Sequence, residues 1–373
     1  MNILFVTDLC PITEKECGLP LTLLNFILDF KALGHNVTLL RPNVIPNILI
    51  RKRKILPDGE YEFQGVKCIN KNFFTPFFSQ NQFKFLKNKD FDVILSHMPS
   101  GILAARKISK LLKIPYFASV HSSDIEVLKN PVYSFLWYSI KKAYNEAKLV
   151  LPRSYWLKDE IEKIIPEIKN KTYIIPSGIE EQFYIEREKI FEKSQGILFP
   201  PLKIFAAGSF IKRKNFKNLI QAISNFDDVE LIIAGDGKEK NHLLNLTKKF
   251  KLQKRIFFTG KRKRKDILEL MEKNPVFILP SIKETFGMVY LEAMAKGCIV
   301  VCSKNSGMAG FIEDSVNGFL IEPSVSGITA VIEKIKNFKN PECLMNKALD
   351  TAFSMERIKM SENYINIIQN ILV

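Results

Sequence analysis

The sequence predicts two consecutive α/β domains, each built on a doubly wound, mostly parallel β-sheet flanked by helices. Short apolar runs that end in small or polar residues alternate with helix-length amphipathic segments, which is the pattern of βαβ units. This rhythm breaks at a polar, proline-containing connector around residues 183–201 and then starts again. The length of 373 residues suits two domains, since one domain commonly holds about 100–200 residues.

In the first half of the chain, six apolar runs are expected to form strands. Helices are expected near 19–33, 100–112 and 131–146, with a fourth that ends near residue 165. Residues 49–89 depart from the rhythm and are interpreted as an excursion from the first domain. The expected strands are NILFVTD (2–8), NVTLLRP (36–42), DVILSH (92–97), PYFASVH (115–121), KLVLPRS (148–154) and TYIIPSG (172–178).

The second half of the chain repeats the pattern with six more apolar runs separated by helical spacing. The predicted domains are therefore 1–183 and 184–355. A last helix in residues 356–373 follows the second domain, and whether it packs back on the first domain is left open by the sequence. The expected strands are KIFAAGS (203–209), VELIIAGDG (229–237), RIFFTGK (255–261), VFILPS (276–281), CIVVCS (298–303) and GFLIEP (318–323).

The composition is that of an ordinary globular protein, but the charge is strongly positive. Hydrophobic residues make up 46% and charged residues 25%, which excludes a disordered or fibrous chain. The net charge is +16 and is spread over both halves of the chain. Such a field favours an anionic partner: nucleic acid, a phosphorylated small molecule or an anionic membrane surface. Charge alone does not choose among these three.

The cysteines and the apolar runs indicate a cytosolic protein. The six cysteines form no C-x-x-C pair, so they are interpreted as reduced packing residues. The N-terminal run MNILFVTDLC has no cationic start and is expected to be a strand and not a signal peptide. No apolar stretch approaches the length of a transmembrane helix, so any membrane association is expected to be peripheral.

The most informative motif is PSIKETFGMVYLEAMAKG, residues 280–297. Ligands of doubly wound sheets bind beyond the carboxyl ends of the strands, and we expect the site in the cleft between the two domains. Glu284 lies in the loop after an expected strand, and Glu292 lies on the second turn of the following helix. Carboxylates on both sides of a helix N-terminus suit a nucleotide sugar, which carries hydroxyls on both sides of a diphosphate. The free amides expected at the diphosphate are those of Gly287, Met288 and Val289.

These residues resemble the retaining, nucleotide-sugar-dependent glycosyltransferases of family 4, whose fold is GT-B: two Rossmann-like domains that face each other across a cleft. The resemblance covers nearly the whole chain. It implies that Glu284 hydrogen-bonds hydroxyls of the donor sugar and that Glu292 binds the ribose. The same motif implies that Gly287, Met288 and Val289 lie at the phosphates.

The family also has a Gly-Arg turn and then a lysine, which together neutralise the diphosphate. The matching stretch here is GSFIKRKN, residues 208–215, in which Lys214 matches the lysine and Ser209 stands where the arginine is usual. Whether Arg213 or Lys212 replaces the missing cation stays open. A lysine at a helix start faces the positive end of the helix dipole, an unfavourable place that a bound diphosphate makes favourable.

Three further residues match the family's donor site. His121, in SVHSSD, matches the histidine beside the donor sugar, and Gly18 matches the glycine that lets the backbone approach the phosphates. The main chain near Arg262 matches the segment at the base. The charge run KRKRK at 261–265 is also compatible with a solvated surface.

The resemblance therefore implies a transferase that moves a hexose-type sugar from a nucleotide diphosphate sugar to an acceptor hydroxyl, with retention. The implied nucleotide is UDP or, alternatively, GDP. The leaving phosphate would help to take the acceptor proton. The implied acceptor is a lipid-linked glycan of capsule or O-antigen assembly, which would place the enzyme on the inner face of the cell membrane. Basic and aromatic residues at 51–54 and 71–89 suggest docking on an anionic bilayer.

No metal or other cofactor is expected. The DFD sequence at 90–92 precedes its strand, at the wrong end of the sheet for a ligand site, and no His, Cys and Asp cluster has metal-ligand spacing. Alternatives are a nucleotide-sugar epimerase of the same fold and a basic nucleic-acid-binding protein, although no nucleic-acid motif is present. A dinucleotide oxidoreductase is disfavoured because no glycine fingerprint follows either first strand.

Overall fold

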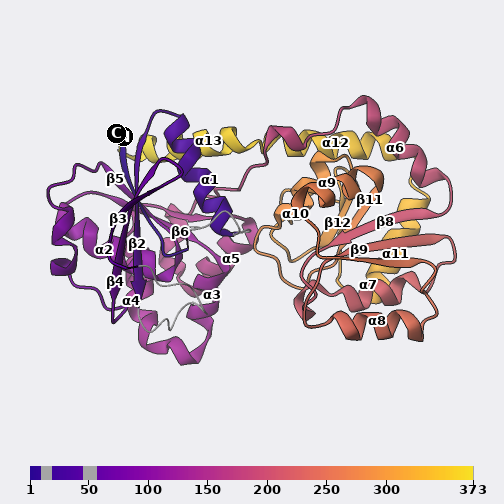
Figure 1. The fold of residues 1–373 in the computed structure, drawn as a ribbon, viewed down its shortest axis with the longest axis horizontal. Coiled ribbons are helices and arrows are strands. Elements are labelled where there is room, and N and C mark those ends of the chain that lie inside the picture. The colour runs from indigo at the N-terminus through magenta and orange to yellow at the C-terminus, as the bar shows by residue number, and fades with distance from the viewer. Residues whose placement is uncertain (10–18, 45–56, 373) are drawn as a thin grey trace. The chain divides into compact units, whose positions relative to one another are not determined.

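A computed structural model describes residues 1–9, 19–44 and 57–372 (Figure 1). The chain divides into two compact units, one formed by Met1–Pro176 with Met360–Val373 and the other by Ser177–Lys359. Each unit has its own sheet and its own hydrophobic core. Among the described helices, none is both long and apolar enough to cross a membrane.

The first unit contains a seven-stranded sheet in the order β3-β4-β2-β1-β5-β6-β7. All neighbouring pairs are parallel except β3 and β4, which form an antiparallel hairpin within the segment that broke the sequence rhythm. The strands are β1 Asn2–Val6, β2 Asn36–Val44, β3 Gly59–Phe63, β4 Val66–Phe73, β5 Val93–Ser96, β6 Tyr116–Val120 and β7 Val150–Pro152.

Helices cover both faces of this sheet, so its central strands are buried along nearly their whole length and are mostly apolar. One core packs beneath α1 and α13, and the other beneath α2, α3, α4 and α5. The helices are α1 Leu19–Ala32, α2 Met98–Leu112, α3 Ser122–Lys129, α4 Ser134–Glu146, α5 Tyr155–Ile164 and α13 Arg357–Leu372, with 3₁₀ helices η1 Gln80–Leu86, η2 Pro131–Tyr133 and η3 Pro166–Lys171.

The C-terminal helix α13 packs on the first unit, the arrangement that the sequence left open. The Tyr364 ring lies edge-on to Phe26 and Phe30 of α1, at centroid distances of 5.5 and 5.4 Å. The Ser361 hydroxyl donates a buried hydrogen bond of 2.8 Å to Asp29, also on α1. These contacts join segments that lie far apart in the chain: Asp29 and Ser361 are separated by 332 positions.

The second unit contains a six-stranded, fully parallel sheet in the order β10-β9-β8-β11-β12-β13. Figure 1 shows α9, α10 and α12 on one side of this sheet and α7 and α8 on the other. The strands are β8 Leu202–Ala207, β9 Val229–Ala234, β10 Ile256–Gly260, β11 Val276–Leu279, β12 Ile299–Ser303 and β13 Phe319–Ile321. The helices are η4 Glu181–Phe183, α6 Glu188–Leu198, η5 Lys212–Lys214, α7 Phe216–Ile223, α8 Lys240–Lys249, α9 Arg264–Lys273, α10 Met288–Ala295, α11 Val325–Lys336 and α12 Pro341–Ser354.

The unit boundaries differ from the sequence-based ones, 183/184 and 355/356, because residues 177–184 pack on the second unit. Ile179 pairs with Glu356 in an isolated parallel bridge. The Tyr184 ring stacks on Phe353 at 4.2 Å, and its hydroxyl donates to the carbonyl of Ala352. The expected strand at 172–178 is also absent as a regular element: this segment bonds to β7 only through single contacts, such as Ile175 N to Pro152 O at 2.8 Å.

In both sheets the first strand lies in the middle, and the chain winds outward from it in both directions. β1 pairs with β2 and β5, and β8 pairs with β9 and β11. Two adjacent strands that continue in opposite directions leave a crevice beyond their carboxyl ends, where such sheets bind ligands. In the second unit this crevice lies between the loops that follow β8 and β11.

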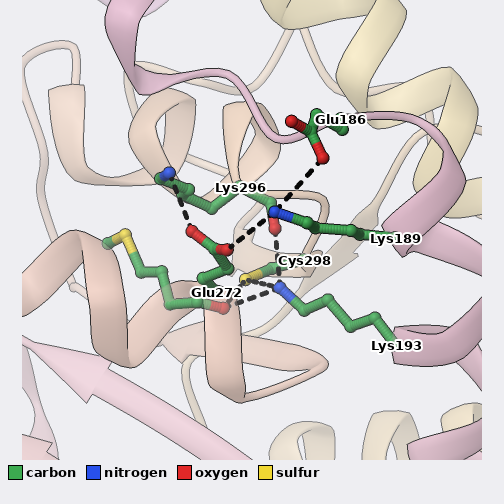
Figure 2. A network of polar contacts seen from close by, with 7 residues as sticks. Glu186, Lys189, Lys193, Glu272, Lys296 and Cys298 are labelled. Atoms are coloured by element: carbon green, nitrogen blue, oxygen red, sulfur yellow. Dashed lines mark hydrogen bonds and ion pairs between the residues drawn. The ribbon is translucent and has the colours of Figure 1, made fainter.

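A half-buried lysine ties α6 to the rest of the second unit (Figure 2). The ammonium group of Lys193 donates to the carbonyls of Met271 and Lys296, both at 2.6 Å, and lies 3.3 Å from the Cys298 sulfur. Burial lowers the pKa of Lys193. Its neighbour Lys189 instead lies in an exposed network with Glu186 and Glu272.

We predict that Lys193→Met destabilises the second unit by about 2 kcal/mol, because buried carbonyls lose their donor. Lys189→Met removes the same charge one turn away and is expected to change the free energy of unfolding by less than about 0.5 kcal/mol. Chemical denaturation of both variants measures the difference. Equal losses would show that the buried contacts of Lys193 do not stabilise the fold.

Candidate functional site

A pocket of about 720 Å³ lies at the carboxyl ends of β8, β9 and β10 in the second unit. It therefore adjoins the crevice that the strand order favours, with the loop after β8 common to both and with α10, which follows β11, as a wall. Its floor and walls come from loop residues after these strands and from the helices α9 and α10. The lining residues are Ala207, Gly208, Ser209, Lys214, Ala234, Gly235, Asp236, Gly237, Lys261, Arg262, Arg264, Ile267, Val289 and Glu292.

Two glycines shape the pocket by close backbone approach. Gly235 has φ +153°, and a Cβ there would lie 2.0 Å from the carbonyl oxygen of Gly208. Gly287 has φ +88° and precedes α10, and a Cβ there would lie 2.5 Å from the Tyr290 ring. Both positions therefore require glycine. Among the described side chains none caps the first turn of α10, which leaves the amides there available to an anion.

Glu284 and Lys214 form an ion pair, although they lie on different loops. The Lys214 ammonium donates to Oε2 of Glu284, and the Arg213 guanidinium lies 3.6 Å from Oε1. Glu284 is 9% exposed. Its loop is held from both sides, since Ile282 N donates to Arg213 O and Gly307 N donates to Glu284 O, both at 2.8 Å. The loops after β8 and β11 thus carry the carboxylate and the cation to one place.

Glu292 lies in the wall of the pocket and is 8% exposed. Its Oε1 accepts a hydrogen bond of 2.9 Å from Nε of Arg264 and lies 2.8 Å from Nη2 of the same guanidinium, as an ion pair. Arg264 also lies 3.2 Å from Glu180, and its guanidinium stacks over the Phe183 ring at 4.3 Å. Burial raises the pKa of Glu292, and the charge of Arg264 opposes that rise.

The remaining second-unit residues predicted for the donor lie at the pocket as well. Ser209 and Arg262 line it, the latter as an exposed side chain. Val289 lines it, and Gly287 and Met288 form the start of α10 beside it. The sequence interpretation missed Arg264 and Glu180. The charge run at 261–265 was the available signal for Arg264, and nothing in the local sequence pointed to Glu180.

His121 belongs to the first unit, where it follows β6 and is buried. Its Nε2 lies 3.1 Å from Nδ1 of His97, whose ring stacks on Phe5. The His121 Nδ1 atom has no hydrogen-bond partner among the described residues. Burial lowers the pKa of His121 well below its usual value, with neighbouring charge adding to the effect, so the ring is neutral at pH 7. Gly18 lies outside the described residues.

The DFD carboxylates act as structural groups. Asp92 accepts a hydrogen bond of 2.7 Å from the main chain of Asn2, and Asp90 accepts one of 3.3 Å from its side chain. Both lie at the amino end of β1, away from the carboxyl edge of the sheet. Within the described part of the chain, no group of three or more His, Cys, Asp or Glu side chains could hold a metal ion.

The fold and the site define a doubly wound α/β protein with a pocket suited to a phosphorylated ligand. Two family models match it: "Glycosyltransferase Family 4" over residues 18–183 and "Glycosyl transferases group 1" over residues 187–352. The chain therefore belongs to the family 4 glycosyltransferases of GT-B fold, as its motifs predicted.

Individual proteins agree with this assignment. The chain is 28% identical to N-acetyl-alpha-D-glucosaminyl L-malate synthase of Bacillus anthracis, over 68% of this chain and 65% of that protein. It is 25% identical to TuaC of Bacillus subtilis, named for teichuronic acid biosynthesis, over 95% and 93%. For three of the relatives, the chain spans only 63% to 65% of their length.

A solved structure shows the same fold. The HepE protein of Anabaena, solved in complex with UDP, superimposes with a TM-score of 0.75 and 18% identity over 99% of this chain and 100% of that one. At this identity the likeness concerns the fold.

Proposed function

We propose that this protein is a retaining glycosyltransferase that moves a hexose-type sugar from a UDP-sugar to an acceptor hydroxyl and releases UDP. The observation that carries the proposal is the second-unit pocket, which is lined by the buried Glu292, by Val289 at the start of α10 and by Lys214, the partner of the buried Glu284. Solved relatives of the fold are described as complexes with UDP and with UDP-glucose, which supports UDP as the carrier, with GDP as the alternative.

In the proposed reaction, the bond between the anomeric carbon and the diphosphate breaks while the acceptor oxygen bonds to the same face of the sugar. The acceptor proton passes to the leaving phosphate, so no protein nucleophile is needed. Lys214 and the amides of Met288 and Val289 stabilise the charge that develops on the diphosphate. Ser209 lies beside the same phosphates without adding charge, and the main chain at Arg262 lies at the base.

The two carboxylates bind different parts of the donor. Glu284 accepts hydrogen bonds from hydroxyls of the sugar, and Glu292 accepts them from the ribose. His121 is assigned to the donor sugar by its match to the family motif. Its ring is neutral, and its buried Nδ1 has no hydrogen-bond partner among the described residues, so in this proposal it contributes a hydrogen bond and no charge. Protein cations supply the positive charge in this proposal, so no metal is required.

Glu284→Gln is expected to abolish transfer while nearly preserving UDP affinity, because the lost charge faces the sugar. Glu292→Ala is expected to weaken UDP itself. Turnover assays and calorimetry with UDP separate the two effects. Normal turnover by Glu284→Gln would contradict the assignment of Glu284 to the sugar. Unchanged UDP affinity in Glu292→Ala would contradict the assignment of Glu292 to the ribose.

Lys214→Ala is expected to slow transfer by about two or more orders of magnitude, by analogy with the loss of one preorganised oxyanion-hole donor from an enzyme. Activity of the wild-type enzyme is expected to survive EDTA. Lys217→Ala, an exposed lysine on α7, is the matched control and should transfer normally. Loss of activity on chelation, restored by magnesium or manganese, would contradict a charge supply by protein alone.

We further propose that the acceptor is a lipid-linked glycan and that the first unit docks on an anionic bilayer at the inner face of the cell membrane. The name of TuaC supports a role in a surface polysaccharide. Of the phenylalanines in 71–89, Phe73, Phe78 and Phe83 are buried in the core, whereas Phe74, Phe77 and Phe85 are exposed. The RKRK run at 51–54 lies outside the described residues.

Aromatic residues of α4 and its N-terminal turn extend the exposed surface. Phe77 lies 6.1 Å from Phe135, ring centre to ring centre, and Tyr138 is 74% exposed. The Lys142 ammonium lies 5.6 Å from the Tyr138 ring centre, so cations accompany the aromatic groups. Each basic residue near an anionic surface contributes about 1 kcal/mol, and inserted aromatics add a part that salt does not screen.

Cosedimentation with phosphatidylglycerol vesicles is therefore expected, decreasing with salt. The double change Phe74→Ser with Phe77→Ser should reduce it, and so should replacement of residues 51–54 by Ser or Gln. Phe257→Ser, at an exposed phenylalanine of the second unit, is the control. Equal recovery with neutral and anionic vesicles, or no effect of these changes, would favour a soluble acceptor.

A further inference from the structure

Arg264 is the residue of the pocket with the most contacts to other charged side chains, and no family motif assigned it a role. It is the first residue of α9. Its guanidinium bonds to Glu292, pairs with Glu180 and stacks on Phe183, using its planar face and three of its nitrogens. Such a group is fixed in direction as well as in charge.

The position of Arg264 is electrostatically unfavourable within its own helix. A cation in the first turn faces the positive end of the helix dipole. The two carboxylates compensate for this, and both come from outside α9: Glu292 from α10 and Glu180 from the segment before η4. The helix therefore presents the cation to the pocket at a cost that these tertiary contacts offset together with Asp266, an acidic residue in the same first turn of α9.

The contacts to Glu292 are asymmetric. The hydrogen bond from Nε and the ion-pair contact of Nη2 both reach Oε1, and no hydrogen bond from a described residue to Oε2 is found. Since Glu292 lines the pocket, Oε2 is the oxygen left for a ligand. Burial favours the neutral form of this carboxyl group, and Arg264 acts against that preference.

We infer that Arg264 is a positioning residue that fixes the side chain of Glu292 so that its second oxygen accepts the ribose hydroxyls of the donor. Glu180 and Phe183 in turn hold Arg264. This inference rests on the proposed function, because it assumes that the pocket binds a ribonucleotide. It adds a specificity role: the arrangement selects nucleotides that carry ribose hydroxyls over those that lack them.

The test compares two ligands, UDP and 2′,3′-dideoxy-UDP, by calorimetry on the full chain. Wild type is expected to bind the dideoxy ligand at least about tenfold more weakly, the scale of a hydrogen bond to a charged group. Arg264→Gln should bind UDP about tenfold more weakly than wild type and should discriminate between the two ligands by less than about threefold. Arg264→Lys should restore part of the discrimination, and Lys265→Gln, with the same charge loss at an exposed neighbour, should behave as wild type.

The outcomes are distinct. If wild type binds neither ligand, the proposed function fails and not the positioning role alone. If Arg264→Gln weakens both ligands equally, Arg264 contacts the phosphates directly and the inference is wrong. Should Arg264→Gln not fold, Glu180→Gln tests the same point, because loosening Arg264 should reduce discrimination between the ligands with little loss of thermal stability. Full discrimination in that variant would also overturn the inference.

Discussion

The second-unit site depends on one constraint: a carboxylate removed from water must be matched by a cation or by hydrogen-bond donors. Glu284 and Glu292 are both nearly buried, and each is matched by a basic side chain from a different element. Neither pair is local in sequence, so both exist only when the sheet has formed. The pairs therefore couple the integrity of the fold to the presence of the site.

The sheet order explains why these elements meet. Because β8 lies at the centre and the chain winds outward on both sides, the loops after β8 and β11 are neighbours, although 70 residues separate Lys214 from Glu284. Glycine at 235 lets the loop after β9 approach the loop after β8, which closes one wall of the pocket. The strand order therefore fixes where the site lies, and the side chains that follow the carboxyl ends of those strands determine its chemistry.

The sequence predicted both sheets and the central motif because their signals are local: apolar runs, their punctuation, and a loop glutamate before a glycine-initiated helix. It could not predict the partners of Arg264, because Glu180 lies 84 residues away and joins the pocket only through the packing of 177–184 on the second unit. The burial of the phenylalanines near residue 75 could not be predicted either. Phe73 and Phe74 are adjacent in the sequence, yet Phe73 is buried and Phe74 is 85% exposed. An irregular segment has no helical or strand periodicity in its apolar residues, so its sequence does not show which side chains face the core.

The two kinds of cation in the pocket differ in what they can do beyond pairing. An ammonium group has three donors on a rotatable stem, so Lys214 can keep its bond to Glu284 and still direct hydrogen bonds toward a diphosphate. A guanidinium is planar, and Arg264 already uses its face on Phe183 and its nitrogens on two carboxylates. The lysine is therefore the more adaptable of the two cations, because its ammonium group can turn toward a new acceptor without leaving Glu284. The arginine is suited to hold a carboxylate still. This difference in side-chain chemistry separates the two ion pairs of the site: one leaves its cation free to reorient, and the other fixes its carboxylate in place.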